Sequence, residues 1–192
     1  MQEIIDFIRE VDRLKGIERK TKPLGLQRYE NSAEHSWQLA VMVLSLSRYA
    51  AAPIDVLQTI KMLLLHDIGE IDTGDTIVYA TAIREEKKKE EQAAVERICG
   101  ILPKETGDEF LALWLEFEAA ETKEARFAKA IDRLQPLLIN TLTGGGTWNE
   151  FGVTEAQAMD RYGAIISRGS PALWQEASRL VAQHFAEQRK KA

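Results

Sequence analysis

The amino-acid sequence predicts an all-α protein that forms one helical bundle. Almost every segment repeats its apolar residues with a period near 3.6, as an amphipathic helix does, and we find no convincing alternating strand. The chain has 192 residues and is 45% hydrophobic, which fits a single domain with one core. We therefore expect one domain over residues 1–192, with a core at about 31–140 and C-terminal helices at 154–190 packed on it.

The N-terminal segment predicts a helix followed by a loop. A helix over residues 2–14 would carry an apolar stripe that we expect to be buried, formed by Ile4, Ile5, Ile8, Val11 and Leu14. Residues 16–30 form a basic connector that contains Pro23 and Gly25, so a loop is expected there.

Two further helices and a loop should follow the connector. The second helix is expected from about residue 31 to residue 50. Pro53 stands before the third apolar run, and proline favours the first position of a helix. Residues 69–83 contain Gly69 and Gly74 and predict a loop.

The second half of the chain predicts five more helices. A charged helix over 84–102 should end at Gly100 or Pro103, because both residues disfavour continuation. The glycine-rich stretch "TGGGTWNEFG", residues 143–152, predicts a flexible break. The remaining helices are expected over 104–120 and 123–142, with two more at 154–190.

Composition excludes several classes of protein. Cys99 is the single cysteine, so the chain has no intrachain disulfide and no thiolate zinc cluster. The net charge of −5, with mixed signs throughout, disfavours a broad nucleic-acid surface. No apolar run approaches the roughly 20 residues that span a bilayer, and the N-terminus lacks the pattern of a secretory signal. We expect a cytoplasmic protein that binds neither membrane nor nucleic acid.

The stretch "LLLHDIGEIDTGD", residues 63–75, raises the question of a metal site. An apolar helix ends there with His66 beside Asp67. Burying an unpaired carboxylate is costly, so a partner must compensate it, and a divalent cation would do so. A site built on imidazole must draw on His35, His66 and His184, the chain's three histidines.

His35 and Asp132 are the remaining candidate ligands. His35 follows a capping box formed by Asn31 and Glu34, and the positive helix end favours the neutral imidazole that binds metal. Taken alone, it also fits a half-exposed histidine of the capping turn. Asp132 lies among core residues and either pairs with Arg133 or Arg126, or binds the metal. Pro136, four residues later, should distort the helix.

Together these residues resemble the H…HD…D pattern of the HD-domain metal-dependent phosphohydrolases, here His35, His66-Asp67 and Asp132. The most specific stretches are "ENSAEHSWQLA" and "LLLHDIGEIDTGD", which look like the 5'-deoxynucleotidase branch. The resemblance covers roughly residues 1–170. It implies an HD-type all-α bundle, often a homodimer, that holds one divalent ion through two histidines and two aspartates. His184 lies outside the pattern, which favours a mononuclear centre.

The resemblance also implies roles for residues around the metal. Glu70 matches the catalytic glutamate of that branch, although a solvent-facing loop glutamate is the plainer interpretation. Asp75, in the triplet Thr73-Gly74-Asp75, matches the aspartate that contacts the sugar hydroxyl. Arg19 is the best match for an arginine that contacts phosphate. Lys20 stands where bacterial members carry a tryptophan, which puts base stacking in doubt.

The predicted function is removal of the 5'-phosphate from (deoxy)ribonucleoside monophosphates by a water that the metal activates. Two imidazoles and two carboxylates suit zinc, cobalt, manganese or iron(II) equally well. One alternative is an HD hydrolase of nucleoside triphosphates or signalling nucleotides. An alternative of another class is a non-catalytic helical binding protein with a structural metal.

Overall fold

The computed structural model describes residues 1–75 and 81–191, except for the side chains of 81–85 and 191, and its regular structure there is helical as predicted. The first helices are α1 (Gln2–Asp12), α2 (Ser32–Leu46), α3 (Val56–Leu65), α4 (Glu70–Thr73) and α5 (Thr81–Cys99). The later ones are α6 (Lys104–Ala119), α7 (Lys123–Leu142), α8 (Gly146–Glu150), α9 (Glu155–Gly169) and α10 (Pro171–Lys191). Short 3-10 turns η1 (Arg13–Gly16) and η2 (Ser47–Tyr49) follow α1 and α2.

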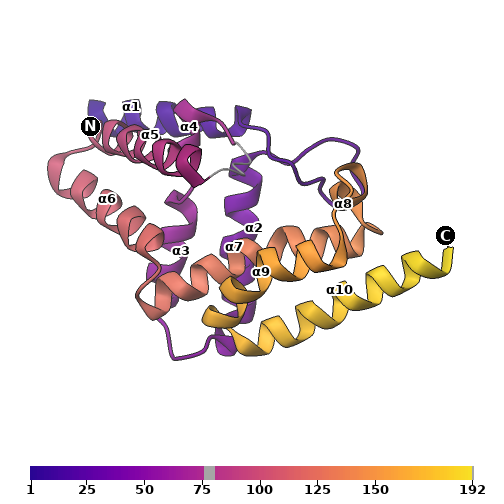
Figure 1. Cartoon of the computed structure of the whole chain (residues 1–192). Coiled ribbons are helices and arrows are strands. Elements are labelled where there is room, and N and C mark those ends of the chain that lie inside the picture. The colour runs from indigo at the N-terminus through magenta and orange to yellow at the C-terminus, as the bar shows by residue number, and fades with distance from the viewer. Residues whose placement is uncertain (76–80, 192) are drawn as a thin grey trace.

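Helix α7 is the centre of the bundle. It packs against α2, α3, α6, α9 and α10, and side chains around most of its circumference are buried. Figure 1 shows α9 and α10 along one side of α7, with α1, α4 and α5 grouped at the opposite end of the molecule. The helix continues through Pro136 without a break. Helices α9 and α10 both contact α7.

The predicted burial of the α1 isoleucines is wrong for this chain. Ile4, Ile5 and Ile8 are 40, 45 and 60% exposed. The helix contacts the bundle through a narrower stripe, in which the Phe7 ring packs edge-on against Phe110 at 5.8 Å. Because α1 lies at the rim of the bundle, most of its apolar face has no helix to cover it.

Two predicted boundaries also differ. Helix α3 begins at Val56, not at Pro53, because the side chain of Asp55 accepts a hydrogen bond from the Gln58 backbone and caps the helix there. The glycine-rich break contains the short helix α8.

The predicted loop over 69–83 contains α4 and the start of α5, while its residues 76–80 lie outside the described part of the chain. Helices α4 and α5 pack against each other there. Gly69, just before α4, permits a close approach: a Cβ at this position would lie 2.9 Å from the backbone oxygen of Glu91. The two helices can therefore approach this closely only because residue 69 has no side chain.

Candidate metal centre and its cavity

His66 and Asp67 lie in the turn that joins α3 to α4, and this turn is firmly held. The indole nitrogen of Trp114 donates a hydrogen bond to the His66 carbonyl at 3.0 Å. The Nδ1 atom of His66 lies 2.8 Å from the carbonyl oxygen of Leu63. A carbonyl oxygen only accepts, so Nδ1 is the protonated nitrogen and the lone pair of a neutral imidazole lies on Nε2.

His35 lies in the first turn of α2, behind the predicted capping box. The Asn31 side chain accepts from the Glu34 backbone, and the Glu34 side chain accepts from the Asn31 backbone. The imidazole is fully buried, so the half-exposed histidine of the alternative interpretation is wrong. Its Nε2 atom lies 3.1 Å from Oδ1 of Asp132, on α7. Asp132 is therefore reached from α2 across the core.

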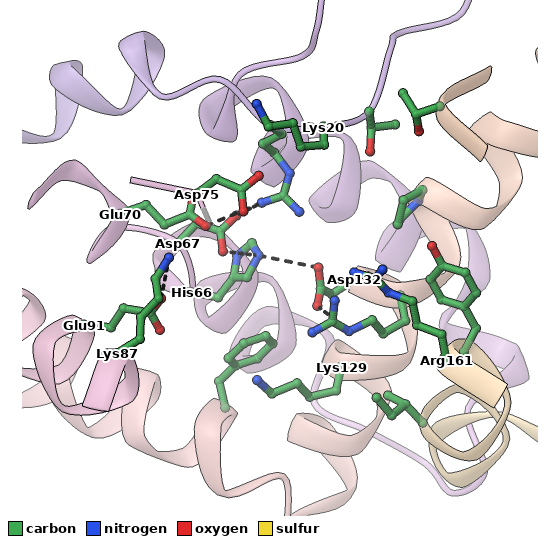
Figure 2. Close-up of a pocket in the computed structure, with 18 of the residues that line it drawn as sticks. Lys20, His66, Asp67, Glu70, Asp75, Lys87, Glu91, Lys129, Asp132 and Arg161 are labelled. Atoms are coloured by element: carbon green, nitrogen blue, oxygen red, sulfur yellow. Dashed lines mark hydrogen bonds and ion pairs between the residues drawn. The ribbon is translucent and has the colours of Figure 1, made fainter. Parts of the chain in front are cut away.

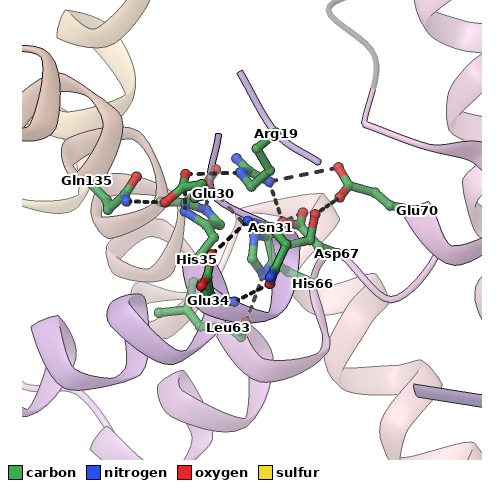
Figure 3. Close-up of polar contacts among 12 residues, drawn as sticks. Arg19, Glu30, Asn31, Glu34, His35, Leu63, His66, Asp67, Glu70 and Gln135 are labelled. Atoms are coloured by element: carbon green, nitrogen blue, oxygen red, sulfur yellow. Dashed lines mark hydrogen bonds and ion pairs between the residues drawn. The ribbon is translucent and has the colours of Figure 1, made fainter. Parts of the chain in front are cut away.

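The structure brings the four predicted ligands together from three parts of the chain. The nearest ligand atoms of His35, His66 and Asp132 lie within 4.8 Å of one another. Asp67 lies beside this cluster, with Oδ1 3.0 Å from Nε2 of His66. Figure 3 shows both imidazoles and Asp67 below the guanidinium of Arg19. The arrangement could hold one divalent cation among two imidazoles and two carboxylates.

Unsatisfied polar atoms and charge both fit a cation at this point. Nε2 of His66 is buried and makes no hydrogen bond within the described chain. Burial opposes ionisation of Asp67 and Asp132, yet the pKa values of both lie well below the usual range. His66 and Arg19 lower the pKa of Asp67, and Arg133 lowers that of Asp132. Burial likewise lowers the pKa of His66, but Asp67 raises it above its ordinary value overall. The surroundings thus favour a positive charge next to Nε2 of His66, and a bound metal ion would supply that charge.

Arg19 is enclosed by carboxylates. Its guanidinium lies 2.5 Å from Oδ2 of Asp67, 3.5 Å from Oε1 of Glu30 and 3.9 Å from Oε1 of Glu70. The connector positions Arg19. The Arg19 backbone N–H donates a hydrogen bond to the Glu30 carbonyl, and Glu18 forms an isolated antiparallel β-bridge with Asn31. Burial alone would lower the pKa of Arg19, but the charges of nearby carboxylates, Asp67 and Glu70 foremost, raise it above its usual value. Arg19 therefore compensates the buried acids at the centre.

Glu70, the first residue of α4, adjoins the centre. Its Oε2 atom accepts a hydrogen bond from the Ser32 hydroxyl at 2.6 Å, which fixes the carboxyl group. Burial, together with the charge of Asp67, raises the pKa of Glu70 to about 9. The plain interpretation of a solvent-facing glutamate does not fit these contacts. A carboxylate with so high a proton affinity is suited to proton transfer.

Asp75 and Thr73 have different positions. Asp75 lines the same cavity as Asp67 and Glu70, and burial raises its pKa. The Thr73 hydroxyl instead donates to the carbonyl of Gly69 within its own turn, and Thr73 does not line the cavity. The structure therefore brings Asp75, but not Thr73, to the candidate site.

The centre opens into a cavity of about 800 Å³. One end carries the metal-site acids, and Figure 2 shows Asp67, Glu70 and Asp75 on one side of His66. The other end lies between α7, α8 and α9, where Figure 2 shows Arg161 on the side of Asp132 away from His66. The walls of this end include Arg133, Trp148, Phe151, Arg161 and Ile165.

Glu30 lies beside the metal centre, and the sequence did not predict this. It is almost fully buried, and its Oε1 atom lies 3.5 Å from Nδ1 of His35, on the side away from Asp132. Its Oε2 atom accepts a hydrogen bond from Gln135 at 2.8 Å. Burial raises the pKa of Glu30 to about 7 against the influence of Arg19. Glu30 opens the stretch "ENSAEHSWQLA", but an acid in a polar connector gives no sign of burial.

His184 packs among aromatic side chains. It is buried on α10, where its ring meets Phe185 edge-on at 5.0 Å and Trp148 at 5.8 Å. It does not belong to the metal-ligand cluster found in the described residues. Among the tryptophans, Trp114 and Trp148 are buried, whereas Trp37 is largely exposed.

Comparisons with known proteins find several relatives of this chain. A model of the HD domain family matches residues 11–174. The chain is 30% identical to the 5'-deoxynucleotidase HDDC2 of Dictyostelium discoideum over 144 residues, which are 72% of this chain and 76% of that protein. It is 28% identical to human 5'-deoxynucleotidase HDDC2 over 136 residues, 70% of this chain and 65% of that protein.

A solved structure is similar over almost the whole chain. It is described as a predicted metal-dependent phosphohydrolase from Magnetospirillum magnetotacticum MS-1. The two chains are 43% identical, with a TM-score of 0.88 and coverage of 96% of this chain and 95% of that one. The likeness in fold therefore extends over the C-terminal helices.

Proposed function

Since this chain belongs to the HD domain family, we propose that it is a metal-dependent phosphohydrolase that removes the 5'-phosphate of (deoxy)ribonucleoside monophosphates. One divalent ion would be held by His35, His66, Asp67 and Asp132. The names of the curated relatives support the nucleotide substrate. The similar solved structure supports the metal-dependent hydrolysis.

The observation that carries this proposal is that the ligand cluster opens into the cavity. His66, Asp67 and Asp132 all line it. A structural metal site closes its shell with protein ligands, whereas a catalytic site keeps a position for water or substrate. A centre at the wall of a large cavity fits the catalytic kind. The non-catalytic alternative gives no reason for Glu70 and Asp75 to line the same space.

Each residue then has a distinct role. When bound, the ion supplies a Lewis acid that makes water a better nucleophile and phosphorus a better electrophile. Glu70, oriented by Ser32, positions the attacking water and accepts its proton. Asp75 accepts a hydrogen bond from a sugar hydroxyl. Arg19 keeps Asp67 ionised, and thus able to bind the cation.

A substrate panel tests this function. We expect the metal-loaded protein to release free phosphate from nucleoside monophosphates, and to do so faster than it hydrolyses di- or triphosphates. Free phosphate and pyrophosphate should be assayed separately, with several divalent ions in turn. Release of phosphate from none of the nucleotides, with metal bound, would refute the proposal. Release of pyrophosphate from triphosphates would favour the triphosphatase alternative.

Oligomeric state and location remain predictions. Trp37, Val41 and Leu44 leave an exposed apolar stripe at helical spacing on α2, which supports the expected homodimer. Light scattering with Trp37→Ser tests it, because a dimer built on this stripe should dissociate. The helices of the described chain include none that is long and apolar enough to span a membrane. A cytoplasmic location is still an expectation.

A further inference from the structure

Two arginines line the far end of the cavity, and within the described chain they share a single carboxylate partner between them. Arg161, on α9, is exposed and forms no ion pair within the described chain; its guanidinium lies 6.0 Å from the ring of Tyr162. Arg133, on α7, has one carboxylate, with its Nε 3.6 Å from Oδ2 of Asp132. Both side chains line the cavity, and Figure 2 shows Arg161 reaching toward Asp132.

The other cations that line the cavity are engaged. Arg19 is enclosed by three carboxylates, as described above. Lys129 lies 2.6 Å from Glu118, and Lys88 lies 3.4 Å from the same carboxyl group. Lys87 donates to the Gly74 carbonyl, and the ammonium of Lys20 lies over the ring of Tyr29. An incoming anion would have to displace an oxygen contact at Arg19, Lys129, Lys88 or Lys87. Within the described chain, Arg161, like Lys20, has only a tyrosine ring beside it.

Asp132 links the arginine pair to the metal centre. Its Oδ1 atom faces the two histidines, and its Oδ2 atom faces Arg133. If the carboxylate binds a metal ion, less of its negative charge remains for Arg133. Two guanidinium groups then face one cavity with little compensation, an arrangement that favours a doubly charged anion.

We propose that Arg133 and Arg161 form the phosphate cradle of this enzyme, which receives the phosphoryl group of the substrate on the side of Asp132 opposite to Arg19. The proposal rests on the proposed function and refines it, because it moves phosphate recognition from Arg19 to α7 and α9. Guanidinium groups can each offer two parallel donors to phosphate oxygens. The monoester dianion would be held beside the metal ligands, with the nucleoside in the remaining cavity.

Titration of inorganic phosphate into the metal-loaded full chain, followed by calorimetry, tests the cradle without turnover. We expect Arg161→Gln and Arg133→Gln each to raise the Kd for phosphate about tenfold or more, as loss of a charge-assisted contact does. Arg161→Lys should recover part of the affinity. Arg168→Gln is the matched control, because Arg168 is exposed on the same helix and does not line the cavity. Its Kd should equal that of the wild type.

The outcomes separate the cradle from the function. An unchanged Kd in Arg161→Gln and Arg133→Gln would refute the cradle, and so would a wild-type chain that binds no phosphate. Arg161 is exposed, so its replacement should leave the melting temperature unchanged and its result stands if Arg133→Gln fails to fold. Phosphate binding that depends on both arginines, without phosphate release from any nucleotide, would refute the proposed function and retain the cradle.

Discussion

The two ends of the cavity treat charge in opposite ways. At the metal end, Arg19 is surrounded by Asp67, Glu30 and Glu70, and the side chains are largely buried. At the far end, Arg161 is exposed and Arg133 shares one carboxylate with the metal centre.

The difference separates charges that serve the metal from charges that remain for a ligand. Negative charge exceeds positive charge at the metal end, which suits a divalent cation. The far end has the reverse excess, which suits a phosphate. Substitutions at the metal end should therefore change the metal content or the reaction rate, and those at the far end should change substrate affinity.

The largest expected effect is at Glu70. Glu70→Gln should lower kcat about 100-fold to 10,000-fold, because it removes the general base while keeping the shape of the side chain. Metal content, measured by elemental analysis, should stay at the wild-type level. Glu90→Gln, at an exposed position on α5, is the control and should keep full activity. A Glu70→Gln variant with wild-type kcat would assign the metal end a structural role alone.

Loss of a ligand should come next. Asp132→Asn should reduce metal affinity by about 10-fold to 100-fold or more, because even groups outside the ligand shell have effects of that size. Asp160→Asn, an exposed change at the far end, should keep the metal. Competition with a chelating dye measures both affinities. Equal metal affinity in the two variants would remove the distinction between the two ends.

Salt should act on the far end more than on the metal end. Raising ionic strength from about 0.05 to about 0.5 M shortens the screening length severalfold, and exposed charges are weakened most. We expect KM for a nucleoside monophosphate to rise while kcat changes little. The rise should be smaller in Arg161→Gln. A salt effect of the same size in both proteins would show that the exposed arginine does not attract the substrate.

The smallest effect concerns stability in the metal-free protein. The pKa of Glu70 is about 9 in the folded chain, against an ordinary value of 4.5 for a glutamate. The unfolded chain therefore releases this proton first as pH rises, and the folded state loses stability between these two values. Glu70→Gln removes this loss. Its melting temperature should exceed that of the wild type by several degrees at pH 8 and match it near pH 4.

Much of the site could be predicted from sequence because the ligands carry local signals. His35 follows a capping box, and His66-Asp67 ends an apolar run, so the sequence alone identifies them as candidate ligands. Only the family resemblance indicated that three chain segments converge on one point, since helix periodicity does not specify which helices meet.

The remaining features depend on tertiary contacts that leave no local pattern. Glu30 is buried by α2 and α7, which are distant in the sequence, and Arg161 reaches the cavity only because α9 packs along α7. The isoleucines of α1 show the opposite error, since they were expected to be buried and are exposed. An apolar stripe predicts a buried face only where another helix covers it. Thr73 likewise sits in the right triplet, but its hydroxyl turns back to its own helix.

Residue 69 is a glycine, and this has a consequence for how substrate selection can evolve. An alanine there would press a methyl group against the Glu91 carbonyl, so α5 would have to swing outward. The cavity, which Gly69 and Glu91 both line, would widen there while the histidines stayed in place. A single added carbon atom would thus change which nucleotides fit.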